Sequence, residues 1–304
     1  MEIKKPQLHQ SHLQMLYRCG EKFKRVVLDG EREPSTTPLV VGTTAHSSIA
    51  NNLNHKINKG HLLTREAVQD FTRDDFVKTW QGSQIVLNEE EISQGLSKTR
   101  DILQDQTIQL VTEHHYVIAP IIKPVSVERK WVLEAEGFDY DMAGTIDVDE
   151  GVGIRDTKTK KTNLSQAEVE KSEQYTFYAL AKFMIDGFLP EYVAQDNLIK
   201  PGKNTPARAI SYYSTREKED FIILYRRFSQ ANKIIKVGLF TPANPSDWWC
   251  SKDFCGFAAN GSCPYFNSKT RKSINRVPIK TEDQDGNQNS IINRLTATLA
   301  SEDK

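Results

Sequence analysis

Two acids and a lysine stand close together in the stretch AGTIDVDEGVGIRDTKTKKTN, residues 143–163. Alternating residues on both sides of a glycine turn predict two consecutive strands, which bring Asp147 and Asp156 together at a sheet edge. Facing carboxylates repel each other unless a cation lies between them, and Mg2+ or Mn2+ favours such oxygen ligands. Lys158 shares a strand face with Asp156, because side chains alternate with a period of two. The set predicts metal-dependent chemistry on a phosphate, whose growing charge Lys158 stabilises.

A surface ion pair is the alternative for a lone D-x-K, since charged residues are mostly solvated. Apolar strand residues surround both acids here, and the next predicted helix carries Gln174 and Tyr178 four residues apart on one face. Taken alone, that second pair is typical of ordinary packing. The Thr157 side chain points to the opposite strand face, but its backbone carbonyl is still able to reach a metal ion.

The four cysteines form a second group. Cys250, Cys255 and Cys263 lie within 14 residues as C-x4-C-x7-C, and Cys19 lies near the start of the chain. Four unrelated buried cysteines are the alternative, but the clustering favours a metal site.

The pattern of apolar residues and caps predicts the elements that position these groups. Helices are expected over 8–28, 43–60, 64–80, 89–114, 165–187 and 214–238, with 34–42 as a loop and capping boxes at Ser165/Glu168 and Ser214/Glu217. Strands are expected over 125–134, 138–150, 154–160 and 207–215. This order predicts an α/β sandwich in which a mixed central sheet is flanked by helices, with an irregular cysteine-bearing flap over 241–266.

Composition excludes some classes of function and leaves others open. The formal net charge is zero, so any polyanion partner must bind to local basic patches. No apolar run approaches the ~20 residues that cross a bilayer, and MEIKKPQLHQ lacks a signal-peptide core. We therefore expect no membrane partner and a cytoplasmic location, in a prokaryote or a virus-infected cell.

The motifs together resemble the PD-(D/E)XK phosphodiesterases, and among them the RecB-like nucleases that carry an iron–sulfur cluster. Such nucleases include the CRISPR-associated adaptation nuclease, the AddB nuclease domain and many phage exonucleases. The matching stretches, in order, are GTTAHSSIA, SVERKW, GTID, IRDTKTK and QYTFY. The resemblance implies a restriction-endonuclease-like fold and assigns the following roles: metal ligands His46, Asp147, Asp156 and the Thr157 carbonyl; catalytic Asp147, Asp156 and Lys158; DNA positioning by Gln174, Tyr178 and Glu128.

The cysteine layout also resembles that of these nucleases, with one cysteine before the motifs and three after them. In relatives such cysteines hold a [4Fe–4S] cluster, which here implies Cys19, Cys250, Cys255 and Cys263. Closing so long a loop stabilises a fold by roughly 5 kcal/mol on the loop-entropy model. The spacing departs from the compact C-x2-C-x5-C, so Zn2+ on four thiolates remains an alternative.

The resemblance implies one RecB-like nuclease domain over 1–268, followed by a weakly ordered polar tail over 269–304. The parts of that domain are a cysteine helix (8–28), a helical part (43–115), a nuclease core (124–237) and a cysteine segment (241–266). The implied function is an Mg2+- or Mn2+-dependent exonuclease acting on single-stranded DNA or DNA ends in recombination, repair or spacer processing. The alternative is a non-catalytic or partner-dependent DNA-binding subunit of a recombination or CRISPR-adaptation complex. A helicase, recombinase or integrase complex is the implied partner.

Several segments are candidates for contact with DNA, although a run of charges is usually a solvated face. They are Lys158, Lys160 and Lys161, the pair Arg226–Arg227, and residues 268–280. Trp248, Trp249 and Phe257 are able to stack on unpaired bases or to shield a cluster. The chain has no G-x-x-x-x-G-K-[ST] pattern, so no ATP motor is expected.

Overall fold

The computed structural model describes residues 5–163 and 165–266. The chain divides into two units, Met1–Ser262 and Cys263–Lys304, and every described helix and strand belongs to the first. The expected tail (269–304) and the basic segment 268–280 lie outside the described residues.

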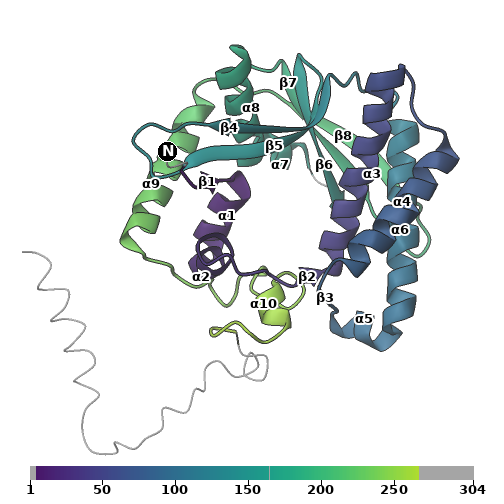
Figure 1. Cartoon of the computed structure of the whole chain (residues 1–304), viewed down its shortest axis with the longest axis horizontal. Coiled ribbons are helices and arrows are strands. Elements are labelled where there is room, and N and C mark those ends of the chain that lie inside the picture. Colours follow the sequence, from purple (N-terminus) through teal and green to yellow (C-terminus); the bar gives the residue numbers. More distant parts are fainter. Residues whose placement is uncertain (1–4, 164, 267–304) are drawn as a thin grey trace, which may run out of the picture. The chain divides into compact units, whose positions relative to one another are not determined.

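A mixed six-stranded sheet forms the centre of the first unit (Figure 1). Its order is β1–β5–β6–β7–β8, and β4 pairs with β5. β5 is antiparallel to β4 and β6, whereas β6 and β7 are parallel. The strands are β1 (Gln7–Leu8), β4 (Ser126–Leu133), β5 (Asp141–Asp149), β6 (Gly153–Lys160), β7 (Tyr192–Ile199) and β8 (Arg208–Ser214). The mixed central sheet predicted from the sequence is therefore confirmed.

Two strands of this sheet were not expected: β1, whose Leu8 was assigned to a helix, and the central strand β7. β7 lies between β6 and β8, and its middle residues Gln195, Asp196 and Asn197 are buried. Three consecutive polar residues interrupt the apolar pattern by which a strand is recognised in a sequence. Their burial depends on polar partners from other elements, which the local sequence does not show. A short second sheet, β2 (Ser35–Thr36) with β3 (Ile85–Val86), was also unforeseen.

Helices cover both faces of the sheet (Figure 1). On one side α1, α8 and α9 enclose a core that we name the α8 core, which includes Leu13, Phe177 and Phe228. On the other side α3, α4 and α6 enclose the α3 core, which includes Leu53 and Phe76. The helices are α1 (Gln10–Arg18), α2 (Gly20–Phe23), a π-helical turn (Lys24–Leu28), α3 (Thr37–Lys59), α4 (Arg65–Gln81), α5 (Glu89–Gln94), α6 (Leu96–Val117), α7 (Gln166–Glu170), α8 (Glu173–Asp186), α9 (Asp220–Val237) and α10 (Gly256–Ala259).

Several predicted helix ends are confirmed. The Thr64 side chain caps α4, and Ser165 with Glu168 forms the expected capping box. Gly60 and Gly187 end α3 and α8 with φ of 80° and 82°, a conformation that glycine adopts without strain.

Three long predicted helices are broken in the structure. The helix over 8–28 is interrupted at Cys19, which is extended and whose sulfur accepts a hydrogen bond from the Lys22 amide. The helix over 89–114 is divided by Gly95, with φ of 86°. The helix from Ser165 is two helices, because Lys171 and Ser172 leave the helical conformation. Apolar periodicity continues across such breaks, so the pattern alone does not show them.

Three boundaries were wrong in other ways. Residues 37–42, expected as loop, are the first turns of α3, where Pro38 is tolerated because the first turn needs no amide donor. Ser214 ends β8 and caps no helix, since α9 begins at Asp220. The cysteine segment, expected as irregular, contains the short helix α10. No described helix combines the length and the apolar character that a membrane span requires.

Candidate active site

Asp147 and Asp156 lie where two neighbouring strands separate. β5 and β6 pair only at Val148–Arg155 and Asp149–Ile154, so the ladder ends just before the two acids. The freed Thr157 amide donates to Oδ2 of Asp147 at 2.8 Å. The two acids therefore meet inside the sheet and not at its edge, in a fork between β5 and β6.

The fork also orients the Thr157 carbonyl. In a strand the amide and carbonyl of one residue point to the same side of the strand. Because the Thr157 amide points at Asp147, its carbonyl points into the fork as well. Its role as a metal ligand stays a prediction.

A break in strand alternation aims a second carboxylate at the same place. The register of β4 with β5 pairs Val127 with Val148 and Arg129 with Ile146, so Glu128 and Asp147 lie between these two pairs. Val148 packs in the α3 core, whereas Ile146 packs in the α8 core. Residues two apart in a regular strand share a face, so the alternation of β5 breaks between Ile146 and Val148, at Asp147. Glu128 has φ of 51°, the only positive value among the described non-glycine residues.

His46 reaches this pair from the middle of α3. Its Nδ1 lies 3.1 Å from Oδ2 of Asp147. One ligand atom each of His46, Glu128 and Asp147 lie within 4.8 Å of one another. One imidazole and two carboxylates are donors that Mn2+ and Mg2+ accept, so this group fits a divalent ion. Glu128 was expected to position DNA, but its geometry makes it a candidate metal ligand. We name His46, Glu128 and Asp147 the metal-binding group.

Asp156 stands beside this group with a different set of neighbours. Lys158 Nζ lies 3.0 Å from Oδ1 and 2.9 Å from Oδ2 of Asp156. Gln174 Nε2 donates to Oδ1 at 3.0 Å, and the Tyr178 hydroxyl lies 3.5 Å from the same oxygen. The Tyr175 hydroxyl, 3.3 Å from Oδ2, completes the surroundings.

Tyr175 was missed in the sequence. It follows Gln174 directly, and α8 turns it inward, where its hydroxyl also lies 2.5 Å from Oε1 of Gln195. The available signal was its place directly after Gln174, but the Q-x-x-x-Y pattern indicated only its two ends, Gln174 and Tyr178.

The protonation of these groups follows from burial and from each other's charge. Burial raises the pKa of Asp156, and Lys158 only partly offsets this effect. Burial lowers the pKa of Lys158, but the charges of Asp156 and Asp147 outweigh it and leave the pKa above its ordinary value. Lys158 is therefore an ammonium at neutral pH and acts as a donor of hydrogen bonds and not as a base.

In the His46–Asp147 pair, each group favours the charged form of the other. Burial opposes ionisation of Asp147, but the hydrogen bond and charge of His46 outweigh it and lower the pKa. Burial lowers the pKa of His46, but the hydrogen bond and charge of Asp147 outweigh this effect and leave the pKa above its ordinary value. The site thus attracts positive charge, and protons compete with a divalent ion for it.

The family follows from a comparison with known sequences. The sequence model of the PD-(D/E)XK nuclease superfamily matches residues 7–265, which include every residue placed above. This chain belongs to the PD-(D/E)XK nuclease superfamily. It is thus a metal-dependent nuclease, in a family that typically uses Mg2+ or Mn2+.

Other comparisons are more distant. No curated protein matches the chain. The crystal structure of SSO0001 is similar at 12% identity, over 77% of this chain and 87% of that one, with a TM-score of 0.28.

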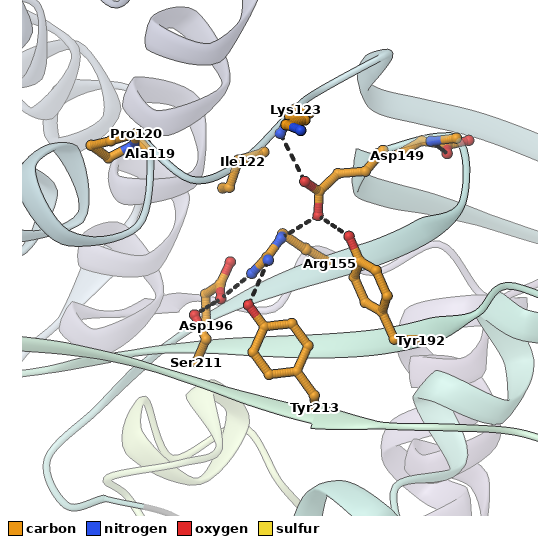
Figure 2. Close-up of polar contacts among 12 residues, drawn as sticks. Ala119, Pro120, Ile122, Lys123, Asp149, Arg155, Tyr192, Asp196, Ser211 and Tyr213 are labelled. Carbon is orange, nitrogen blue, oxygen red and sulfur yellow. Dashed lines mark hydrogen bonds and ion pairs between the residues drawn. The ribbon is translucent and has the colours of Figure 1, made fainter.

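A buried ionic network lies on the other face of β6 in this PD-(D/E)XK chain (Figure 2). The Arg155 guanidinium donates to Glu150 at 2.5 Å, to Asp196 at 2.9 Å and to the Tyr213 hydroxyl at 2.8 Å. Glu150 also accepts from the Tyr192 hydroxyl at 2.7 Å. Because Arg155 adjoins Asp156, this network fixes the start of the fork.

Two of the four cysteines of the nuclease lie at the start of short helices and not on the strands of the fork. The Cys19 sulfur caps α2 by accepting from the Lys22 amide, and Cys255 precedes α10 without a capping hydrogen bond from its side chain. Burial raises the pKa of the Cys255 thiol, and the Lys22 charge opposes this shift. Cys250 follows Trp249, which packs against Arg18. Cys263 belongs to the second unit.

The surface candidates for DNA contact differ in their surroundings. Arg227 pairs with Glu173 and lies over the Tyr17 ring, so its charge is already engaged, whereas Arg226 is exposed. Phe257 is buried under the Arg25 guanidinium, while Trp248 is 59% exposed. Of the aromatic residues proposed for stacking, Trp248 is the accessible one.

Proposed function

We propose that this nuclease is a RecB-like exonuclease that degrades single-stranded DNA or DNA ends. The observation that carries the proposal is the fork, where His46, Glu128 and Asp147 converge beside the Asp156–Lys158 pair. A divalent ion held by these three residues would lie next to the Lys158 ammonium, which supports metal-assisted hydrolysis of a phosphodiester.

Each side chain has a separate role in the proposed reaction. A bound Mg2+ or Mn2+ supplies Lewis acidity that polarises the phosphate and makes water a better nucleophile. Lys158 donates to a phosphate oxygen and stabilises the charge that develops there. Gln174 and Tyr175 hold the Asp156 carboxylate in place through the hydrogen bonds given above.

The cysteines form the second part of the proposal. Cys19, Cys250, Cys255 and Cys263 hold a [4Fe–4S] cluster that joins the two ends of a nuclease domain spanning 1–268. The Lys22 amide donates to the Cys19 sulfur, and the Lys22 charge acts to lower the pKa of the Cys255 thiol, so one lysine is near both cysteines, which supports this assignment. Zn2+ is the alternative occupant, and the iron and sulfide content of anaerobically purified protein decides between the two.

The test is cleavage of end-labelled DNA with Mg2+, with Mn2+ and with EDTA. We expect metal-dependent cleavage that Lys158→Ala lowers by about a hundredfold to a thousandfold while DNA binding remains. Lys203→Ala, which removes an exposed lysine of the β7–β8 connection, is the matched control. Linear single strands should be degraded and circular single strands should resist, because an exonuclease needs an end.

The alternative is a DNA-binding subunit that needs a partner for turnover. The exposure of Trp248, within the cysteine segment, is the observation that favours a DNA-binding role outside the fork. Binding of DNA by folded, cluster-loaded protein, with no cleavage under any metal condition, supports this alternative and rejects the stand-alone enzyme.

A further inference from the structure

A pocket of about 720 Å3 extends from the metal-binding group along α3. We name it the α3 pocket. Six waters around a metal ion need roughly 200 Å3, because each water occupies about 30 Å3 in the liquid. Most of the pocket is therefore available to a larger ligand. The lining comes mainly from α3, with Phe71 from α4, Glu128 from β4 and Asp147 from β5: Pro38, Leu39, Gly42, Thr43, His46, Ser47, Ala50, Asn51, Asn54, Phe71, Glu128 and Asp147.

The lining excludes a phosphate other than the scissile one as the occupant of the pocket. It contains no lysine or arginine, and its two charged acids repel anions. A phosphate is acceptable only where a divalent ion or Lys158 compensates its charge. The rest of the pocket must hold an uncharged part of the substrate.

The far wall of the pocket has the chemistry of a base-binding site. Ser47, Asn51 and Asn54 recur at the spacing of one helix face, and Asn54 lies about 12 Å along the axis from His46. No described residue hydrogen-bonds to these three side chains, so their donors and acceptors are available to a ligand. Phe71 adds a half-buried aromatic ring to the same lining.

These features together fit a nucleobase. Amide side chains pair with the edges of bases, and an aromatic ring stacks on any base face. A base is able to enter such a pocket only when it is unpaired, because in a duplex its edge is occupied and its faces are stacked.

We propose that the α3 pocket holds the unpaired base of the nucleotide next to the scissile phosphate. Asn51 and Asn54 hydrogen-bond its edge, and Phe71 contacts its face. This inference rests on the proposed nuclease function and adds a reason for a preference for single strands or frayed ends. It makes the uncharged wall of α3, and not a basic surface, the part of the site that recognises the unpaired state.

The experiment combines base removal with side-chain removal. Fluorescein-labelled 20-nucleotide single strands carry one abasic site, moved one position at a time from each end. Affinity is measured by fluorescence anisotropy with Ca2+ in place of Mg2+. In the wild type, we expect one abasic position to weaken binding roughly tenfold, as the loss of one base contact does.

The variants show whether the pocket makes that contact. Asn51→Ala/Asn54→Ala should weaken binding of the intact strand by a similar factor. In this variant, the abasic site at the sensitive position should cause no further loss of affinity. Phe71→Leu, which keeps an apolar side chain, should give the same loss of sensitivity in part. Asn58→Ala, an exposed asparagine of α3 outside the pocket, is the matched control and should behave as the wild type.

The outcomes separate this inference from the proposed function. The inference is overturned if an abasic site weakens binding by the same factor in the pocket variants as in the wild type at every position. Cleavage of intact DNA would then still support the nuclease. A wild type that binds no DNA rejects both. Coupled effects without cleavage support the base pocket and reject only the stand-alone enzyme.

Discussion

At the scale of single residues, Glu128 combines a strained backbone with a carboxylate at the metal-binding group. Its φ of 51° lies in the left-handed region, which costs an L-residue about 1 kcal/mol or more relative to glycine. Burial and the nearby charge of Asp147 also raise the pKa of its carboxyl. Such strain persists where the surrounding strands hold the residue in place.

We therefore expect Glu128→Gly and Glu128→Ala to differ in stability and not in activity. Both remove the carboxylate and should lower cleavage at least about tenfold, the least expected for loss of a group at a metal site. Only glycine relieves the backbone strain, so Glu128→Gly should unfold with a free energy about 1 kcal/mol higher than Glu128→Ala. Urea denaturation measures the difference, and equal midpoints would show that the backbone here is unstrained.

The burial of His114 without hydrogen-bond partners in the described chain predicts a loss of stability in acid. His114 is buried, neither ring nitrogen has a hydrogen-bond partner in the described chain, and burial, together with the Arg155 charge, lowers its pKa to about 3. The unfolded chain, with a pKa near 6.5, binds the proton more tightly, so the free energy of unfolding falls as pH drops from 6.5 towards 3. This amounts to about 2 kcal/mol between pH 7 and pH 5.

His114→Leu should remove that part of the pH dependence. Urea unfolding measures the free energy of unfolding at pH 7 and at pH 5. Between these two pH values, this free energy should fall by about 2 kcal/mol less in the variant than in the wild type. His61→Leu removes an exposed histidine and is the control. An unchanged loss in His114→Leu would assign the acid sensitivity to other groups.

At the scale of elements, the fork depends on what holds β5 and β6 together below it. Only two residue pairs join these strands, and the Arg155 network continues the connection from Glu150 to Asp196 of β7. Removing one partner of a buried ion pair typically costs 3–5 kcal/mol, because the remaining charge stays buried.

Arg155→Met should therefore lower the free energy of unfolding by about 3–5 kcal/mol. The triple change Arg155→Met, Glu150→Gln and Asp196→Asn should recover part of this loss, because no buried charge is left unpaired. Chemical denaturation compares the three proteins. A single variant within about 1 kcal/mol of the wild type would contradict a structural role for the network.

At the scale of the whole first unit, residues near its two ends are in contact. The Gly20 amide donates to the Thr241 carbonyl at 2.7 Å, and Glu33 accepts from the Gly256 amide at 2.8 Å. A Cβ at Gly256 would lie 2.2 Å from the Pro34 carbonyl oxygen, so the two segments approach closely. The proposed cluster would hold together an arrangement that the backbone already forms.

Cys255→Ala should then lower stability and solubility, with activity lost as a consequence. The chain-entropy estimate for closing so long a loop is on the order of 5 kcal/mol. Thermal unfolding and iron content are the measurements, and Ser251→Ala, in the same segment without loss of a thiol, is the control. Full stability of an iron-free Cys255→Ala protein would argue against a structural cluster.

The sequence by itself determined the elements whose signals are local. The strands around Asp147 and Asp156 and the caps at Thr64 and Ser165 depend on side-chain alternation and on neighbours three or four residues away, so they can be read from short windows. The relation of Lys158 to Asp156 was predictable for the same reason. The order of the motifs was sufficient to indicate the family.

Only the tertiary structure decided what depends on distant partners. The central strand β7 stays hidden because Asp196 is buried through its contacts with Arg155 and Ser211, which lie elsewhere in the sequence. The same holds for the left-handed backbone that brings Glu128 to His46, since it depends on strand register and not on local propensity. Burial, charge pairing and the break in alternation at the fork are properties of the assembled sheet, and no window of sequence contains them.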